Sequence, residues 1–440
     1  MSELPKTWVK IEIGKICELI NGRAFKPTDW TATGLPIVRI QNLNNPDAPF
    51  NRFDGQVRDR FLIEHGVLLF AWSGTPGTSF GAHVWNGGKA VLNQHIFHVI
   101  FDADVLDRDF LRHAINQKLE ELINKAHGGV GLRHVTKGTF EETEIELPPR
   151  PEQRRIVSKL DSLIARTKAA CAELACIPLL IEHYRQAILA KAFVGTLTSD
   201  WRESHSIPLS RWESSKIENI SKIITEFTPP TKHKNKYFGG DIPFFKPTDL
   251  DAGYHVKEPR ETLTSEGAAV GRKIPPRSTL VTCIGATIGK TGFARVQCCT
   301  NQQINAVIPE KGRVVPEWLF WMIMSPPFQS QILDNASATT LPIINKSRFS
   351  RLTVSLPPWE EQVEIVHRIE LALDWLNVVS TEQRHAARLA GHLGDRLRAK
   401  AFRGELVPQD PNDEPAEKLL ERIRTVRALP SRRNARSARR

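Results

Sequence analysis

KAFVGTL occupies residues 191–197 and KAFRGEL occupies residues 400–406, so the chain contains nearly the same seven residues twice, 209 positions apart. Other landmarks repeat at the same offset: Leu147-Pro148-Pro149 with Leu356-Pro357-Pro358, Glu152-Gln153 with Glu361-Gln362, and Ile156-Val157 with Ile365-Val366. A constant offset between so many landmarks excludes chance. It indicates two duplicated segments of equal length, and a repeat of this kind determines the architecture.

The segment after each Leu-Pro-Pro is predicted to form one long helix, over residues 152–192 and 361–401. Proline ends the preceding strand, the Glu lies in a first turn, where negative charge is favoured, and Gly195 and Gly404 supply the stop signals. Steps of four and three residues meet apolar side chains at nine of ten positions in each copy, a 3.5-residue period that is typical of a coiled-coil seam. The predicted seam contains Ile156, Leu160, Leu163, Leu174, Ile177, Ile181 and Ile188, and Ile365, Ile369, Leu376, Val379, Leu393 and Leu397.

Each predicted helix is about 60 Å long at 1.5 Å per residue, and the obvious partner for each seam is the other copy. Pro178 falls inside the first helix, where its counterpart in the second is Ala387. Because a proline inside a helix costs about 3 kcal/mol and bends it, we expect a kink at this position.

The stretches that precede the two helices are related more weakly. Their shared landmarks are Trp8 with Trp212, Asn93-Gln94 with Asn301-Gln302, and residues 132–140 with residues 341–349. Short β-rich runs punctuated by Gly, Pro and Asn, with one helical stretch in each half, predict two related α+β domains. The predicted organisation is domain 1 (residues 1–149), a first helical spacer (150–205), domain 2 (206–357), a second helical spacer with a C-terminal helix (358–425), and a disordered basic tail (426–440).

The chain has 440 residues and a net charge of +11, but residues 421–440 hold eight Arg and one acid and so carry +7 of it. A basic tail adds non-specific affinity for phosphates, so the high isoelectric point does not establish DNA binding by the rest of the chain. No apolar run approaches the roughly 18 residues that span a membrane, and the N-terminus lacks the layout of a signal peptide. Six Cys without a CxxC pair suit neither a zinc site nor a disulfide framework, so we expect a protein of the reducing cytoplasm.

The order of domain, Leu-Pro-Pro, long helix and KAF-x-G, present twice, resembles the specificity subunit of Type I restriction–modification enzymes over nearly the whole chain. The resemblance implies two target-recognition domains held apart by two antiparallel helices, each domain reading one half of a split double-stranded DNA target. It further implies docking of two methyltransferase subunits and two restriction subunits. In that family the specificity subunit performs no chemistry and binds no cofactor, and the partner subunits use AdoMet, ATP and Mg²⁺.

Residues that differ between the halves are the predicted base readers, because features shared by both halves do not explain two different readings. The candidates are Gln41 and Asn42 against Thr248 and Asp249; Ser73, Thr75 and Ser79 against Thr287 and Lys290; and Arg133 and His134 against Pro342 and Ile343. Cations shared by the halves are predicted to contact phosphates and set the register: Arg39 with Lys246, and Lys137 with Lys346; Arg348 is a further candidate. The shared Asn-Gln pairs are assigned to structural or backbone-contacting roles.

Two stretches resemble enzyme motifs. GATIGKT (285–291) has three residues between its glycines where a phosphate-binding loop needs four, and a strand is predicted after it. SPPF (325–328) resembles the catalytic motif of amino-methyltransferases, but no Gly-rich strand–turn–helix for AdoMet accompanies it, so a kinked helix is predicted. No His/Asp/Glu cluster has metal-ligand spacing, which predicts no metal site.

Three other functions remain open at this point. The chain is alternatively the specificity subunit of a Type IIB-like enzyme, in which methylation and cutting share one partner chain. It is alternatively a self-contained AdoMet-dependent methyltransferase or an ATPase, which binding of labelled AdoMet or ATP would reveal. The third is a coiled-coil scaffold whose DNA affinity disappears when the basic tail is removed.

Overall fold

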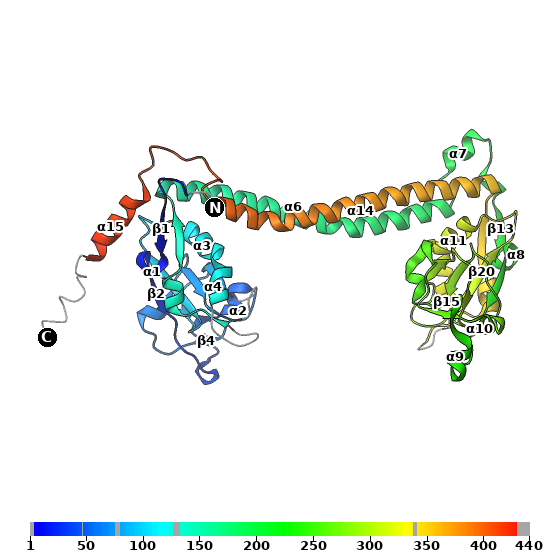
Figure 1. Cartoon of the computed structure of the whole chain (residues 1–440), viewed down its shortest axis with the longest axis horizontal. Coiled ribbons are helices and arrows are strands. Elements are labelled where there is room, and N and C mark those ends of the chain that lie inside the picture. The colour runs from blue at the N-terminus through cyan, green and yellow to red at the C-terminus, as the bar shows by residue number, and fades with distance from the viewer. Residues whose placement is uncertain are drawn as a thin grey trace. The chain divides into compact units, whose positions relative to one another are not determined.

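The computed structural model describes residues 4–45, 47–74, 80–125, 133–226, 228–337 and 341–428. The chain folds into two compact units: unit 1 is Met1–Glu173 with Ala387–Arg440, and unit 2 is Leu174–Ala386. Each unit contains one of the two predicted domains together with part of each long helix (Figure 1). The division therefore falls within the helices, because each end of a helix packs against its own domain.

Unit 1 contains an antiparallel sheet with the strand order β2-β10-β6-β8 and a second sheet with the order β4-β3-β9-β5, in which β3 and β9 are parallel. Two further pairs are β1 with β12 and β7 with β11. The strands are β1 (Val9–Glu12), β2 (Cys17–Asn21), β3 (Leu35–Val38), β4 (Arg52–Phe53), β5 (Leu62–Ile63), β6 (Leu68–Ala71), β7 (Ser73–Gly74), β8 (Gly81–Val84), β9 (Ala90–Leu92), β10 (Ile96–Phe101), β11 (Arg133–His134) and β12 (Glu144–Leu147). The helices are α1 (Ile13–Ile16), α2 (Ile40–Asn44), α3 (Arg108–Gln117), α4 (Leu119–Lys125), α5 (Lys137–Glu141) and α15 (Ala416–Ala428).

Unit 2 contains an antiparallel sheet with the order β14-β20-β17-β18, a sheet with the order β16-β15-β19, and the pair β13 with β21. The strands are β13 (Glu213–Lys216), β14 (Ser221–Thr225), β15 (Phe238–Phe245), β16 (Glu261–Leu263), β17 (Thr279–Thr282), β18 (Thr291–Phe293), β19 (Cys299–Thr300), β20 (Ile304–Pro309) and β21 (Thr353–Leu356). The helices are α7 (Ser199–Ser204), α8 (Ile217–Ile220), α9 (Lys234–Tyr237), α10 (Ser265–Ala269), α11 (Pro316–Met324), α12 (Pro326–Asp334) and α13 (Lys346–Ser350). The two long helices are α6 (Arg150–Phe193) and α14 (Trp359–Ala401).

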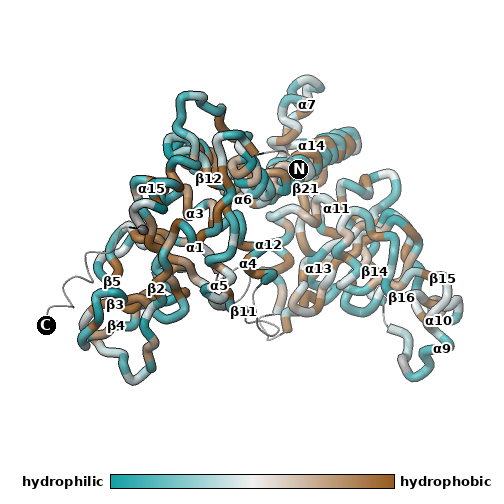
Figure 2. Tube along the Cα trace, turned by 60° about the vertical axis from the view of Figure 1, so that its left-hand side comes forward, coloured by the Kyte–Doolittle hydropathy of each residue, from teal (hydrophilic) through white to brown (hydrophobic). Residues whose placement is uncertain are grey.

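The two units share one plan, which confirms the prediction of two related α+β domains. The four-stranded antiparallel sheet of unit 1 has its counterpart in unit 2, and so has the parallel pair, since β15 pairs with β19 as β3 pairs with β9. Helices α11, α12 and α13 follow in unit 2 where α3, α4 and α5 follow in unit 1. Figure 2 shows hydrophobic stretches in the strands of both units and mixed hydropathy along α14.

The long helices run antiparallel in each unit. In unit 1, Leu160 near the start of α6 shares a core with Leu397 near the end of α14. In unit 2, Leu189 near the end of α6 shares a core with Ile369 near the start of α14. The predicted seam is therefore packed in both units, where it is continuous with the domain core.

Most predicted seam positions are shielded from solvent. Ile156, Leu160, Ile365, Ile369 and Leu376 are buried, and Leu163, Leu174, Ile177, Ile181, Ile188, Val379 and Leu397 are half-buried. Leu393 is 42% exposed, however, and its counterpart Tyr184 is 60% exposed. A helix with 3.6 residues per turn drifts about 20° per heptad from a strict 3.5 repeat, and after four heptads the buried face has moved by one residue. Leu189 and Ala192 are fully buried for this reason, one position beyond the predicted seam.

The duplicated Glu anchors each domain to its long helix. In unit 1, Trp8 Nε1 donates to Glu152 Oε2 at 3.0 Å, and in unit 2, Trp212 Nε1 donates to Glu361 Oε2 at 2.8 Å. Both carboxylates are buried, at 1% and 0% exposure. The repeat therefore preserves a buried hydrogen bond between two landmarks, in addition to the first-turn charge that the sequence predicts.

The duplicated Gln joins the same two elements through three hydrogen bonds. Gln153 accepts from the backbone nitrogen of Asp107 at 2.7 Å and donates to the carbonyl oxygens of Val105 and Pro148. Gln362 makes the equivalent three bonds, with the nitrogen of Val315 and the oxygens of Arg313 and Pro357. In both side chains the amide oxygen and the amide nitrogen are hydrogen-bonded to backbone groups. Replacing either Gln therefore leaves buried backbone groups unpaired.

The KAF-x-G motif ends each long helix and turns the chain back onto the anchor. Gly195 and Gly404 have positive φ angles of 82° and 74°, as expected of the residue after a helix end. In unit 2 the chain then places Arg202 Nη1 at 2.5 Å from Glu361 Oε1. In unit 1 it places Gln409 Nε2 at 2.5 Å from Glu152 Oε1. The two anchors thus differ in charge, since only the Glu361 anchor contains a buried cation among its hydrogen-bond donors.

Burial raises the pKa of Glu152 above its usual value, although Gln409 and Trp8 donate to it. A carboxyl group with a raised pKa in the folded state contributes stability that is complete below its unfolded pKa of about 4.3 and is lost as pH rises through the folded pKa. We therefore expect the stability of unit 1 in the parent to fall as pH rises above about 4.3, and we expect Glu152→Gln to abolish this fall. Urea midpoints of the parent and the variant between pH 4 and pH 8 measure this, and parallel curves would contradict it.

The two stretches that resemble enzyme motifs lie at a turn between strands and at a break between helices. GATIGK lies in the turn between β17 and β18, and Thr291 begins the strand that was predicted to follow. SPPF separates α11 from α12 at the buried Ser325, which confirms a break in the helix. Helix α6 continues through Pro178. At the other end of the chain, residues 426–428 belong to α15 and not to the predicted tail, and residues 429–440 lie outside the described part.

Candidate nucleic-acid interface

Several predicted base readers of unit 1 meet where β7 pairs with β11. Ser73 Oγ lies 2.9 Å from His134 Nδ1, and the His134 ring packs against the Trp72 ring at a centroid distance of 5.8 Å. Arg133 belongs to β11 by its backbone, and its side chain lies outside what the structure describes. Thr75 and Ser79 also lie outside the described residues.

We call the place where β7 pairs with β11 the corner of unit 1. A second group of polar side chains lies beside this corner and lines a cavity of about 250 Å³. Its polar residues are Arg39, Gln41, Asn93, Gln94 and His95, and its apolar residues are Phe25, Trp30, Ile37 and Ile40. His95 connects the two groups, since its ring lies 5.4 Å from the Trp72 ring. Burial, with His134 and Arg39 nearby, lowers the pKa of His95 below its usual value. The cavity and the strand pair thus form one surface of unit 1, with a neutral imidazole at their junction.

The same backbone arrangement recurs in unit 2 with different side chains. Equivalent positions are Trp72 and Cys283, Ser73 and Ile284, His134 and Ile343, and His95 and Gln303. A backbone hydrogen bond closes the corner at 2.9 Å in unit 1, from Val135 to Trp72, and at 3.0 Å in unit 2, from Ile344 to Cys283. One backbone frame therefore presents aromatic and imidazole groups in unit 1, and aliphatic and amide groups in unit 2.

Asn42 and Asp249 differ in type but have the same structural role. Asn42 Oδ1 accepts from the backbone nitrogen of Arg39 at 3.1 Å, and Asp249 Oδ2 accepts from the backbone nitrogen of Lys246 at 2.7 Å. Both side chains are buried, at 4% and 8% exposure. The remaining polar atoms bind neighbouring backbone groups, so we leave both residues out of the proposed interface.

We expect Asn42→Ala to lower the stability of unit 1 by about 1–3 kcal/mol, because it removes the three hydrogen bonds of a buried amide to the backbone. The DNA sequence that the chain recognises should stay the same. Urea denaturation measures the first effect, and a methylation map measures the second. A stable variant with an altered target sequence would show that Asn42 reads a base.

The remaining candidates lie on exposed or half-exposed surface. Lys137 and Lys346 begin the equivalent helices α5 and α13, and Arg348 lies two residues into α13. Thr248 immediately precedes the 3₁₀ segment Asp249–His255, and Thr287 lies in the turn between β17 and β18; both are exposed.

Three of these cations have acidic partners. Lys246 Nζ lies 2.7 Å from Glu261 Oε1, Lys290 Nζ lies 2.6 Å from Asp251 Oδ1, and Lys137 pairs with Glu141 at 3.6 Å. A surface pair of this kind is weak, so a DNA phosphate competes for the lysine.

Sequence reasoning missed Trp72, His95 and Gln303. The aromatic Trp72 reads as an ordinary strand residue, and His95 and Gln303 follow the shared Asn-Gln pairs, which were assigned a structural role. For His95 and Gln303 the sequence offers one signal, which is that the residue after an identical Asn-Gln pair differs between the halves. The structure supports half of that earlier assignment, because Asn93 and Asn301 are buried and each accepts from the backbone nitrogen two residues later.

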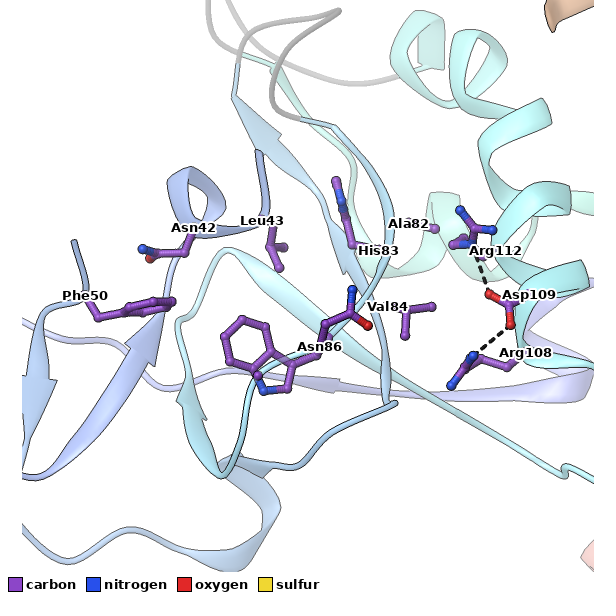
Figure 3. Close-up of a pocket in the computed structure, with 12 residues that line it drawn as sticks. Asn42, Leu43, Phe50, Ala82, His83, Val84, Asn86, Arg108, Asp109 and Arg112 are labelled. Atoms are coloured by element: carbon purple, nitrogen blue, oxygen red, sulfur yellow. Dashed lines mark hydrogen bonds and ion pairs between the residues drawn. The ribbon is translucent and has the colours of Figure 1, made fainter. Parts of the chain in front are cut away.

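A larger cavity of about 670 Å³ lies between α2, β8 and α3 in unit 1 (Figure 3). Arg108 and Arg112 line it, but Asp109 lies between them, 2.8 Å from Arg108 Nη2 and 3.3 Å from Arg112 Nε. Asp161 adds a second acid near Arg112, at 3.6 Å. The two cations are balanced by two acids, so this cavity is a poorer candidate for binding phosphate than the corner at β7.

No helix in the described part of the chain is long and apolar enough to cross a membrane. The described residues also contain no group of three or more His, Cys, Asp or Glu that could hold a metal ion.

Comparison with known proteins identifies the repeated domain. The family model described as the Type I restriction modification DNA specificity domain matches residues 5–174 and again residues 210–377. The chain belongs to this family. It is therefore a DNA specificity protein of the Type I restriction–modification class, with one copy of the domain in each unit.

Relatives match along almost the whole chain. The specificity subunit of the EcoBI enzyme from Escherichia coli is 27% identical over 448 residues, which cover 96% of this chain and 93% of that protein. The specificity subunit of the EcoKI enzyme from the same species is 25% identical and covers 97% of both chains. The solved HsdS subunit from Thermoanaerobacter tengcongensis shares the fold, with a TM-score of 0.67 at 21% identity over 92% of this chain and 98% of that one.

Proposed function

We propose that this specificity subunit reads a bipartite double-stranded DNA target, with unit 1 reading one half-site and unit 2 the other. One observation carries the proposal: the two units place the same backbone frame at β7–β11 and at Ile284–Ile343 and equip it with different side chains. A shared frame docks on DNA in a similar way, and different side chains then recognise different base edges.

The chemistry of the two corners suits direct readout. His134 and Gln41 offer hydrogen-bond donors and acceptors in unit 1, where the buried Ser73 holds the His134 ring. Gln303, Thr248 and Thr287 offer them in unit 2, where the neighbouring isoleucines suit a thymine methyl group. The lysines at the first positions of α5 and α13 are placed alike in both units. They therefore suit phosphate contacts that orient each unit without selecting a sequence.

The long helices are proposed to set the distance between the half-sites and to receive the partner subunits. An antiparallel pair of helices of more than 40 residues each is a stiff spacer. We propose two methyltransferase subunits and two restriction subunits as partners, which use AdoMet, ATP and Mg²⁺ in the cytoplasm, while this chain binds no cofactor and performs no chemistry itself.

Binding of labelled AdoMet and ATP to the purified chain, alone and together with its partner methyltransferase, tests this division of labour. We expect neither ligand to bind the chain alone and methylation of DNA to require both proteins. Methylation by the chain alone would contradict the proposal and favour a self-contained methyltransferase.

A further inference from the structure

In unit 1, the amide nitrogen of Gln94 forms a hydrogen bond with the ring of His95. Gln94 Nε2 lies 3.1 Å from His95 Nε2, and because an amide nitrogen only donates, the imidazole accepts. The lowered pKa of His95 favours a neutral ring, whose Nδ1–H tautomer has a lone pair on Nε2 for this bond. Gln94 Oε1 has no hydrogen-bond partner in the described part of the chain, and Gln94 lines the cavity of about 250 Å³ beside Arg39 and Gln41.

In unit 2, the equivalent residue is Gln302, and here the amide oxygen forms the hydrogen bond. Thr228 Oγ1 donates to Gln302 Oε1 at 2.7 Å. The Nε2 atom of Gln302 has no hydrogen-bond partner among the residues that the structure describes, and the side chain is exposed. The residue that precedes each Gln is the buried Asn that fixes the turn, so Gln94 and Gln302 start from equivalent backbone positions.

We propose that the identical residues Gln94 and Gln302 read different base edges, because their neighbours hold opposite ends of the two amides. Gln94 presents its oxygen and accepts from a base amino group, such as N4 of cytosine or N6 of adenine. Gln302 presents its nitrogen and donates to a base acceptor, such as O6 or N7 of guanine or O4 of thymine. His95 and Thr228 act as positioning residues, since each contacts one end of its amide and leaves the other end unpaired among the described residues. A residue shared by both halves therefore contributes to two different specificities.

The inference rests on the proposed function. It adds that one half-site contains a base that donates to Gln94 and the other a base that accepts from Gln302. It also revises the rule that shared residues do not distinguish the halves, because the orientation of a side chain depends on residues that are not shared. Thr228 follows β14, about 70 residues before Gln302, whereas His95 is adjacent to Gln94. The two positioning residues thus come from different parts of the two domains.

One substitution made in both copies tests the proposal. Gln→Glu replaces the amide nitrogen with a second acceptor oxygen of the same size. In Gln94→Glu the presented oxygen is kept, and neutral His95 donates in place of accepting by moving its proton to Nε2. In Gln302→Glu the bond from Thr228 is kept, but the presented donor becomes an acceptor. Both variants add the same negative charge, so each is the control for the other.

The full chain, with its partner methyltransferase, is expressed in a bacterium without other methylation, and methylated bases are mapped across the host genome. We expect Gln94→Glu to keep the parent motif. Gln302→Glu should reduce methylation of parent sites by about tenfold or more, with discrimination lost at one base pair of one half-site. Equal effects of the two substitutions, or a loss in Gln94→Glu alone, would overturn the proposal.

Thr228→Val provides a second readout that does not add charge. It removes the hydroxyl that holds the Gln302 oxygen, so discrimination should relax at the same base pair that Gln302→Glu affects. Co-purification with the methyltransferase shows that each complex has assembled. A motif unchanged in both unit 2 variants would overturn the proposal and leave the bipartite function intact, whereas a parent chain that methylates no split motif would refute the function itself.

Discussion

Glu361→Gln is expected to destabilise unit 2 by about 3–5 kcal/mol, because it leaves the buried Arg202 cation without its counter-charge. Glu361 is fully buried and accepts from Arg202 at 2.5 Å, from Thr198 at 2.8 Å and from Trp212 at 2.8 Å. An amide replaces one of these acceptor oxygens with a donor. Hydrogen exchange of unit 2 peptides and the urea midpoint of the full chain measure the loss.

Glu152→Gln is the matched control in unit 1. Glu152 accepts from Trp8 and Gln409, both neutral, and the Gln409 amide can reverse to accept from the new amide nitrogen. We therefore expect a change below about 1 kcal/mol near pH 7, because the variant leaves no buried cation without a counter-charge. Equal losses in the two variants would show that the buried cation is not what distinguishes the two anchors.

Leu160→Asp is expected to unfold unit 1, at a cost of more than about 4 kcal/mol, because it places a charge in the largest core of that unit. Leu376→Asp changes an equally buried seam position, at 2% exposure, that lies outside the domain cores. It should loosen the helix pair and reduce assembly with the methyltransferase while the domain of unit 2 stays folded. From the sequence alone the two positions are equivalent, but only Leu160 belongs to a domain core.

Trp375→Asp is the control for the second change, since Trp375 precedes Leu376 on the same helix and is 62% exposed. Its stability as an isolated chain should match that of the parent. Circular dichroism during thermal unfolding measures the stability of each variant, and hydrogen exchange shows which of the two units has unfolded. If Leu160→Asp leaves unit 1 protected from exchange, the core assignment is wrong.

The sequence predicted the repeat, both long helices and most of the seam, because these features follow a fixed period or a fixed offset. It did not predict the role of Glu361, since the donors Thr198 and Arg202 lie about 160 residues away and nothing local indicates that the chain turns back. The drift of the buried face to Leu189 also has no local signal, because a strict 3.5 period and a real helix differ only after several turns.

The candidate interface was harder to predict than the fold. Ser73 and His134 were proposed because the halves differ there, but Asn42 and Asp249 also differ and form equivalent hydrogen bonds. Gln94 and Gln302 are the opposite case, because identity between the halves conceals a difference in their neighbours. Side-chain hydrogen bonds decide both cases, and a sequence does not display them even where the partner lies nearby, as for Asn42 and Gln94.

The most direct test of a bipartite specificity subunit is the methylation map of the parent chain. The chain is expressed with its partner methyltransferase in a bacterium free of other methylation, and modified bases are located by single-molecule sequencing. We predict a motif of two unlike short halves around a fixed gap of unspecified bases. A continuous motif, or no methylation by an assembled complex, would contradict the reading of separate half-sites by units 1 and 2.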